Sequence, residues 1–157
     1  MRLLIRIVAD FKVVRIVLDT NVLISACWSP GGLEAQLVQL VIERRLTLCV
    51  TDAVLAEYRD VSRRSKFEAR HMCLEEMLSG LTAVAQMVEP GGPTEAAHDP
   101  DDNRLLECAE GGEAQWLITG NARHFPFIWR GAQIANARKF FTANPGLLAP
   151  ESPSASL

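Results

Sequence analysis

The sequence predicts an α/β domain built around a mostly parallel sheet. Short, β-branched apolar runs alternate along the chain with longer segments whose apolar residues recur at helical spacing. Successive strands separated by helices pair in parallel, because each connection has to cross back over the sheet. With 157 residues, 48% of them hydrophobic, the chain suits one domain with a substantial buried core.

The first third of the chain supplies two strands and two helices. Residues 13–18 form a β-branched run that ends at an acid, as expected for a buried strand. A short helix is predicted over 20–28, because the sequence Ser-Pro-Gly-Gly follows it and breaks helical structure. Residues 33–45 have apolar positions at helical spacing, and the apolar run 46–50 predicts a second strand.

The middle of the chain is mainly helical. Thr51 can cap a helix that we expect to continue to residue 65. A further helix is predicted over 67–81 from the spacing of its leucines and methionines. Residues 84–88 fit a third strand, which the turn Pro-Gly-Gly-Pro ends.

The last third predicts one helix, two strands and a closing helix. Pro100 suits a first helical position, and a Gly-Gly pair ends the helix expected over 100–110. Residues 115–119 and 133–135 fit strands, and 136–142 fits a short helix. The domain is expected to span residues 14–143. Residues 1–13 are expected to be an N-terminal extension, and the Pro- and Ser-rich residues 144–157 a disordered tail.

Composition indicates a cytoplasmic protein. No apolar run approaches the roughly 20 residues that span a bilayer, and charges interrupt the N-terminal apolar stretch, so neither a membrane span nor a signal peptide is expected. The four cysteines form no CxxC pair and no zinc spacing with the histidines. We therefore expect reduced thiols in the core. The net charge of −3 argues against broad, nonspecific affinity for nucleic acid.

Acidic and amide side chains follow predicted strands or begin predicted helices. Asp19 directly follows one strand, Asn121 follows another by two residues, and Glu57 lies beside the apolar stripe of its helix. Asp99, Asp101 and Asp102 stand at a helix start. The carboxyl ends of parallel strands meet at one crevice, so these side chains are candidates to converge there. Converging carboxylates repel one another unless a cation lies among them, and oxygen-only ligands suit Mg²⁺ or Mn²⁺.

Each of these residues also has a purely structural interpretation. Asp19 and Asp99 can be helix caps, Asp101 is expected to face solvent near the helix start, and Asn121 can be a turn residue. His124 is interpreted as a packed loop histidine rather than a base.

The ordered combination of motifs resembles the PIN domain family, and within it the VapC-like toxins of prokaryotic toxin–antitoxin systems. The matching segments are RIVLDTNVLISA at 15–26, TDAVLAEYRDV at 51–61, DPDDNRLLECA at 99–109, LITGNARHFP at 117–126 and WRGAQIANARKFF at 129–141. The resemblance implies a three-layer α/β/α domain that hydrolyses RNA with Mg²⁺ or Mn²⁺.

Carried over by position, the resemblance implies that Asp19, Glu57 and Asp102 are metal-binding and catalytic acids, with Asn121 in place of a fourth acid. Asn103 is the alternative position for the third acid in other branches of the family. Thr20, Asn21, Asp99 and Thr119 are candidates to orient the ligands or to contact substrate.

The resemblance also implies an antitoxin partner and a homodimer. The basic residues Arg59, Arg63, Arg64 and Lys66 can contact an RNA backbone, or can simply be a solvated helix end. Two alternatives to a toxin nuclease stay open. One is a non-catalytic PIN-like binding module with a decayed metal site, and the other is an RNA-processing nuclease outside any toxin–antitoxin pair.

Overall fold

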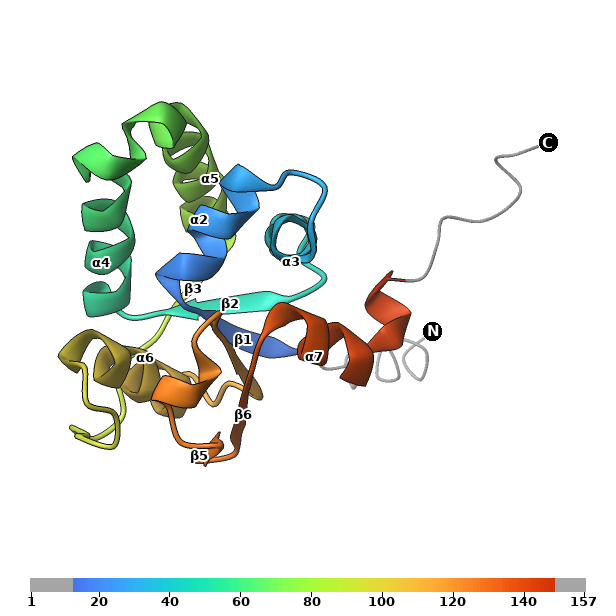
Figure 1. Cartoon of the computed structure of the whole chain (residues 1–157). Coiled ribbons are helices and arrows are strands. Elements are labelled where there is room, and N and C mark those ends of the chain that lie inside the picture. Colours follow the sequence, from blue (N-terminus) through green and yellow to red (C-terminus); the bar gives the residue numbers. More distant parts are fainter. Residues whose placement is uncertain (1–12, 149–157) are drawn as a thin grey trace, which may run out of the picture.

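The computed structural model describes residues 13–148 and shows the predicted α/β architecture (Figure 1). A six-stranded sheet has the order β3-β2-β1-β4-β6-β5. Every neighbouring pair is parallel except β5 and β6. The strands are β1 (Arg15–Leu18), β2 (Thr47–Val50), β3 (Gln86–Met87), β4 (Trp116–Ile118), β5 (Ile128–Trp129) and β6 (Ala132–Ala135).

Helices cover both faces of this sheet, which confirms the three-layer arrangement. α2 (Thr20–Trp28), α3 (Leu33–Ile42) and α5 (His71–Val84) pack together on one face, and α7 (Ala137–Ala143) contacts α3 on that side (Figure 1). α6 (Pro100–Gly111) lies across the other face against β1, β2 and β4. α4 (Asp52–Ser62) contacts both α5 and α6, so it connects the two helical layers beside the sheet.

The sheet centre is fully apolar because it is covered on both faces. Val17 of β1, Leu48 of β2 and Leu117 of β4 are no more than 1% exposed. Parallel strands buried in this way have continuous hydrophobic sequences, which is why the sequence predicts them well. β5 was not predicted, because its two residues lie at the sheet edge and carry too short a pattern to recognise.

Several predicted elements differ from those observed. The helix expected over 67–81 begins later, since a 3₁₀ helix at Ser65–Arg70 precedes α5. The strand expected over 84–88 is reduced to β3, because α5 continues through Val84. Part of the expected tail is ordered into a 3₁₀ helix at Pro145–Leu148. The rest of that tail, and residues 1–12 of the predicted extension, lie outside the described residues.

The expectation of four reduced thiols is wrong for one pair. Cys27 near the end of α2 and Cys73 near the start of α5 form a disulfide across 46 residues of sequence. Cys49 and Cys108 are free and buried, as predicted. Burial raises the pKa of the Cys108 thiol to about 12, so this thiol stays protonated near neutral pH. Between residues 13 and 148, none of the helices is long and apolar enough to cross a membrane.

Candidate functional site

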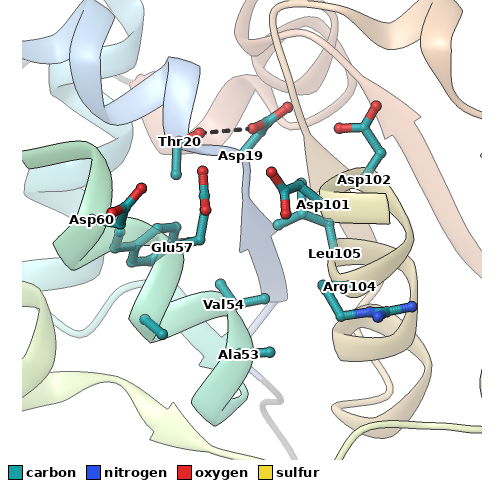
Figure 2. A pocket seen from close by; sticks show the side chains of 12 residues that line it. Asp19, Thr20, Ala53, Val54, Glu57, Asp60, Asp101, Asp102, Arg104 and Leu105 are labelled. Carbon is teal, nitrogen blue, oxygen red and sulfur yellow. Dashed lines mark hydrogen bonds between the residues drawn. The ribbon is translucent and has the colours of Figure 1, made fainter. Parts of the chain in front are cut away.

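Acidic side chains from three elements line one cavity at the carboxyl end of β1. The cavity has a volume of about 320 Å³ and lies between the end of β1, the inner side of α4 and the first turn of α6. Asp19, Glu57 and Asp102, the three acids predicted from sequence, all line it. Figure 2 shows Asp19, Glu57 and Asp101 turned toward the same space from β1, α4 and α6.

The Asp19 carboxylate is held by hydrogen bonds from neighbouring side chains. Thr119 Oγ1 donates to Asp19 Oδ2 at 2.8 Å, and Asn21 Nδ2 donates to the same oxygen at 3.3 Å. Thr20 Oγ1 donates to Asp19 Oδ1 at 3.3 Å. Although Asp19 occupies the N-cap position of α2, its side chain accepts no hydrogen bond from a backbone N–H of that helix. The capping interpretation therefore fails for the carboxylate, which faces the cavity instead.

The strands beneath Asp19 fix its backbone. Asp19 N donates to Ile118 O at 2.9 Å, which ties the end of β1 to the end of β4. Tyr58, buried on α4, donates its hydroxyl to Leu18 O at 2.5 Å. Asp19 itself is only 8% exposed and Thr119 is fully buried. This part of the site is therefore set by the sheet and by α4 packed against it.

Glu57 faces the cavity from α4 and is partly neutralised. Arg64 contacts Glu57 Oε1 at 3.2 Å and Asp60 Oδ2 at 3.1 Å. Burial, and then the nearby charge of Asp101, raise the pKa of Glu57, while Arg64 opposes that shift. Arg64, one of the four residues of the predicted basic run, thus lies against acids beside the cavity.

Asp102 reaches the cavity from the first turn of α6. Burial, and then the negative charges of Asp19 and Asp99, raise its pKa to about 6. His124 acts in the opposite direction. Asp102 therefore keeps its proton at pH values between its ordinary pKa and about 6, where ordinary carboxylates are charged. The cavity therefore concentrates negative charge that protein cations only partly offset.

Asp101 and Asp60 also line the cavity, and the sequence did not place them there. Asp101 was expected to face solvent at the start of α6, where it would only favour the helix dipole. Asp101 is exposed, as expected, but it also lines the cavity, and its carboxylate turns toward Glu57 (Figure 2). For Asp60, the sequence did contain a signal: it lies three residues after Glu57 on α4, and residues at that spacing share a helix face.

The fourth predicted residue, Asn121, does not join the three acids. It is exposed and is not among the residues that line the cavity. Its backbone N–H donates to Thr119 Oγ1 at 3.0 Å, so its main chain supports the group that holds Asp19. Asn121 precedes a short 3₁₀ helix at Ala122–His124, as expected of a turn residue.

The remaining candidates divide between structural and site-supporting roles. Asp99 Oδ1 accepts from Asp101 N at 2.8 Å, which confirms its capping interpretation. The buried Asn103 amide bonds both the N–H and the carbonyl of Ala97 and so holds the preceding loop. His124 is exposed, so its interpretation as a packed histidine is wrong.

The donor chemistry of the cavity fits a hard divalent cation. Its acidic groups are all carboxylates, which Mg²⁺ and Mn²⁺ prefer. Burial, and then the charges of neighbouring acids, raise the pKa of Asp102 and of Glu57. Within the described part of the chain, however, no three His, Cys, Asp or Glu side chains are grouped closely enough to hold a metal ion as they stand. Binding one here requires these side chains to rotate toward each other.

Comparisons with known proteins agree with the fold and the order of motifs. The chain is 25% identical over 111 residues to the uncharacterized protein MJ1680 of Methanocaldococcus jannaschii, covering 69% of this chain and 71% of that protein. Its fold is similar to a chain in the crystal structure of VapBC2 from Rickettsia felis bound to a DNA fragment from their promoter. The TM-score is 0.50 and the identity 15%, with 76% of this chain and 98% of the other covered.

A profile of the PIN domain matches residues 15–123, which include Asp19, Glu57, Asp102 and Asn121. The match covers more than half of the chain and spans β1 to the 3₁₀ helix that follows β4. The chain therefore belongs to the PIN domain family.

Proposed function

We propose that this protein is a metal-dependent endoribonuclease of the PIN type and the toxin of a toxin–antitoxin pair. One observation carries the nuclease part: Asp19, Glu57 and Asp102 come from three separate elements and line a single cavity. A packed fold gains no stability from gathering like charges, so their convergence favours a functional role.

In this proposal the three acids hold a divalent cation, Mg²⁺ or Mn²⁺. Such an ion, when bound, lowers the pKa of a water and stabilises negative charge on a phosphodiester. Thr119, Asn21 and Thr20 orient the Asp19 carboxylate by donating hydrogen bonds to it. Tyr58 holds the end of β1 in place beneath it.

The toxin part of the proposal has separate support. The likeness to a chain of the Rickettsia felis VapBC2 structure favours a VapC-like protein and an antitoxin partner. The proposal includes a homodimer, as the family resemblance implies. Co-expression tests this part directly. The parent gene should arrest growth of a host cell, the Asp19→Asn gene should not, and a small protein encoded beside the native gene should relieve the arrest.

RNA cleavage tests the nuclease part. Purified parent protein with Mn²⁺ should cut a single-stranded RNA, and Asp19→Asn should cut it at least 100-fold more slowly, since the cation contributes several kcal/mol to such reactions. Glu76→Gln, which removes an exposed acid from α5, is the matched control and should cut at the parent rate. Equal rates for the parent and Asp19→Asn would sink the proposal.

A second candidate is a non-catalytic binding module. Two observations favour it: Asn121 replaces an acid, and the cavity acids are not already grouped as a metal site. A folded parent that neither binds Mn²⁺ nor cuts RNA would establish this alternative. A parent that cuts RNA without arresting growth would instead indicate an RNA-processing nuclease.

A further inference from the structure

The C-terminal part of the domain carries positive charge only. Residues 114–148 contain no Asp or Glu, whereas the whole chain has a net charge of −3. Their basic residues are Arg123, Arg130, Arg138 and Lys139, with His124 beside them. This segment forms β4, β5, β6 and α7, so it is the side of the sheet away from the acidic helix α4. A polyanion whose phosphate lies in the cavity would find its complementary charge on this side.

An aromatic ring is exposed within this basic segment. Phe127, just before β5, is 73% exposed, although phenylalanine is usually buried. The Nζ of Lys139, on α7, lies 4.8 Å from the centre of its ring. The backbone there is fixed, because Ile134 N donates to Phe127 O at 3.3 Å. Phe127 is thus a ring held at the sheet edge with a cation on it and much of its surface open to solvent.

The sheet order gives an approximate lateral spacing between the strands next to Asp19 and Phe127. Asp19 follows β1, and Phe127 precedes β5, which lies three strands away across β4 and β6. Three strand spacings correspond to roughly 14 Å. The 3₁₀ helix Ala122–His124 follows β4 and precedes Phe127 in the chain. A nucleic-acid strand of a few nucleotides spans this separation.

We propose that Phe127 and Lys139, here called the stacking surface, bind an unpaired base and its phosphate in the strand that enters the cavity. This rests on the proposed ribonuclease function and adds that the substrate is single-stranded at that position. A base stacks on the open face of the Phe127 ring, and Lys139 supplies positive charge beside it. The bases of a duplex are already stacked on each other and cannot reach the ring.

Charge favours a nucleic acid over a protein as the occupant. The apolar part of this surface is small, formed by Phe127 and the 56%-exposed Ile128. Lys139 on the ring, in a segment that contains no acid, matches phosphate. A protein contact at this surface is one of the outcomes that the test below can reveal.

Binding is measured separately from cleavage. A fluorescein-labelled single-stranded RNA is titrated with protein in EDTA, which prevents cleavage, and followed by fluorescence anisotropy. Phe127→Ala should weaken binding about 5- to 100-fold, as expected for the loss of one stacked base. Phe127→Trp should restore binding to near the parent level, because the larger ring also stacks. Lys139→Ala should reduce the slope of log binding constant against log salt concentration by the amount expected for about one phosphate contact.

Two controls separate stacking from general effects. Met72→Ala removes an exposed apolar side chain on α5 (74% exposed) and should leave binding unchanged. A duplex of the same sequence should bind parent and Phe127→Ala equally. Thermal melting should show that every variant is folded, as expected for changes at exposed positions.

Several results would overturn the inference. One is equal RNA binding by the parent and Phe127→Ala. Another is a loss of RNA binding in Phe127→Ala that Phe127→Trp does not restore. A third is a change in self-association of Phe127→Ala without any change in its RNA binding. The proposed function fails independently: a parent that binds RNA through Phe127 but never cuts it contradicts the nuclease and keeps the stacking surface. If the parent cuts RNA and Phe127→Ala leaves kcat/KM unchanged, the nuclease function stands and the stacking surface is contradicted.

Discussion

Asp19 and Asp102 face the same cavity, but the fold holds them in different ways. Asp19 stands at the end of a central strand, is 8% exposed and accepts hydrogen bonds from three side chains. Asp102 stands in the first turn of a helix and accepts no side-chain hydrogen bond among the described residues; its raised pKa records burial and negative neighbours. The sheet thus supplies a carboxylate that three side chains hold, whereas α6 supplies one without such hydrogen bonds.

Within the proposed function, this difference also bears on cation binding. The acids are not grouped closely enough to hold a cation as they stand, so a bound ion would have to draw Asp102 and Glu57 toward Asp19. Bringing the carboxylates together without a cation would cost free energy, because like charges would approach in a partly buried space. We therefore expect the two sides of the cavity to respond differently to substitution, to pH and to metal.

After the loss of Asp19 itself, the largest effect is expected on the helix side. Asp102→Asn should lower Mn²⁺ affinity and RNA cleavage about 100-fold, because a neutral amide replaces one of three charged ligands. Titration calorimetry and a cleavage assay on the same sample measure both quantities. Asp52→Asn, in the exposed first turn of α4, is the control and should match the parent. If Asp102→Asn binds Mn²⁺ as tightly as the parent, Asp102 is not a ligand.

On the sheet side, the residue to change is the one that orients Asp19. Thr119→Val keeps the shape of the buried side chain but removes its 2.8 Å hydrogen bond to Asp19. Mn²⁺ affinity should fall about 10-fold, the range known for groups that orient metal ligands. Thr142→Val, which removes a hydroxyl bonded to Arg138 O on exposed α7, is the matched control. An unchanged affinity in Thr119→Val would mean that the sheet does not need to fix Asp19.

The raised pKa of Asp102 predicts a pH effect on the metal-free protein. Its pKa is about 6 in the fold against an ordinary 3.8, so folding favours the protonated form. The stabilising contribution is complete below the ordinary pKa and disappears as pH rises through about 6. After allowance for solvent screening, the free energy of unfolding should fall by about 1–2 kcal/mol for this reason.

Comparison with Asp102→Asn isolates this contribution. Chemical denaturation of the parent and the variant in EDTA, from about pH 4 to about pH 7.5, should show the parent losing relative stability as pH rises. Added Mn²⁺ should remove the difference between the two proteins in the pH dependence of stability, because it binds the charged form of Asp102. A stability gap between the two proteins that is constant with pH would contradict the raised pKa.

The smallest effect is expected at Asn121. Asn121→Asp restores an acid that the family pattern implies, yet this side chain is exposed and lies outside the cavity lining. Mn²⁺ affinity should change by no more than about 3-fold, because solvent and salt screen a charge at such a position. A gain of ten-fold or more would show that residue 121 reaches the metal and that the described orientation is not the one that binds it.

The three acids could be predicted from sequence because their positions depend on local structure. Asp19 follows a buried strand, and Asp102 starts a helix that Pro100 and Asp99 define. Both features depend on a few neighbouring residues. The order of the motifs along the chain then pointed to one crevice, and the observed sheet order brings β1 and β4 together as that prediction requires.

Features that depend on how distant elements pack were not predicted. Asp101 lines the cavity rather than facing only solvent because α4 packs beside α6, which places Glu57 opposite it. The Cys27–Cys73 disulfide requires α2 and α5 to be adjacent, and no spacing in the sequence reveals this. Asn121 lies outside the cavity because the chain turns into a 3₁₀ helix just after β4.

The most direct test of the account is isothermal titration of Mn²⁺ into the metal-free parent and Asp19→Asn, with RNA cleavage assayed on the same samples. The account predicts that the parent binds Mn²⁺ and cuts RNA, and that the folded variant does neither. A folded parent that binds no Mn²⁺ and cuts no RNA, or an Asp19→Asn variant that keeps both properties, would contradict it.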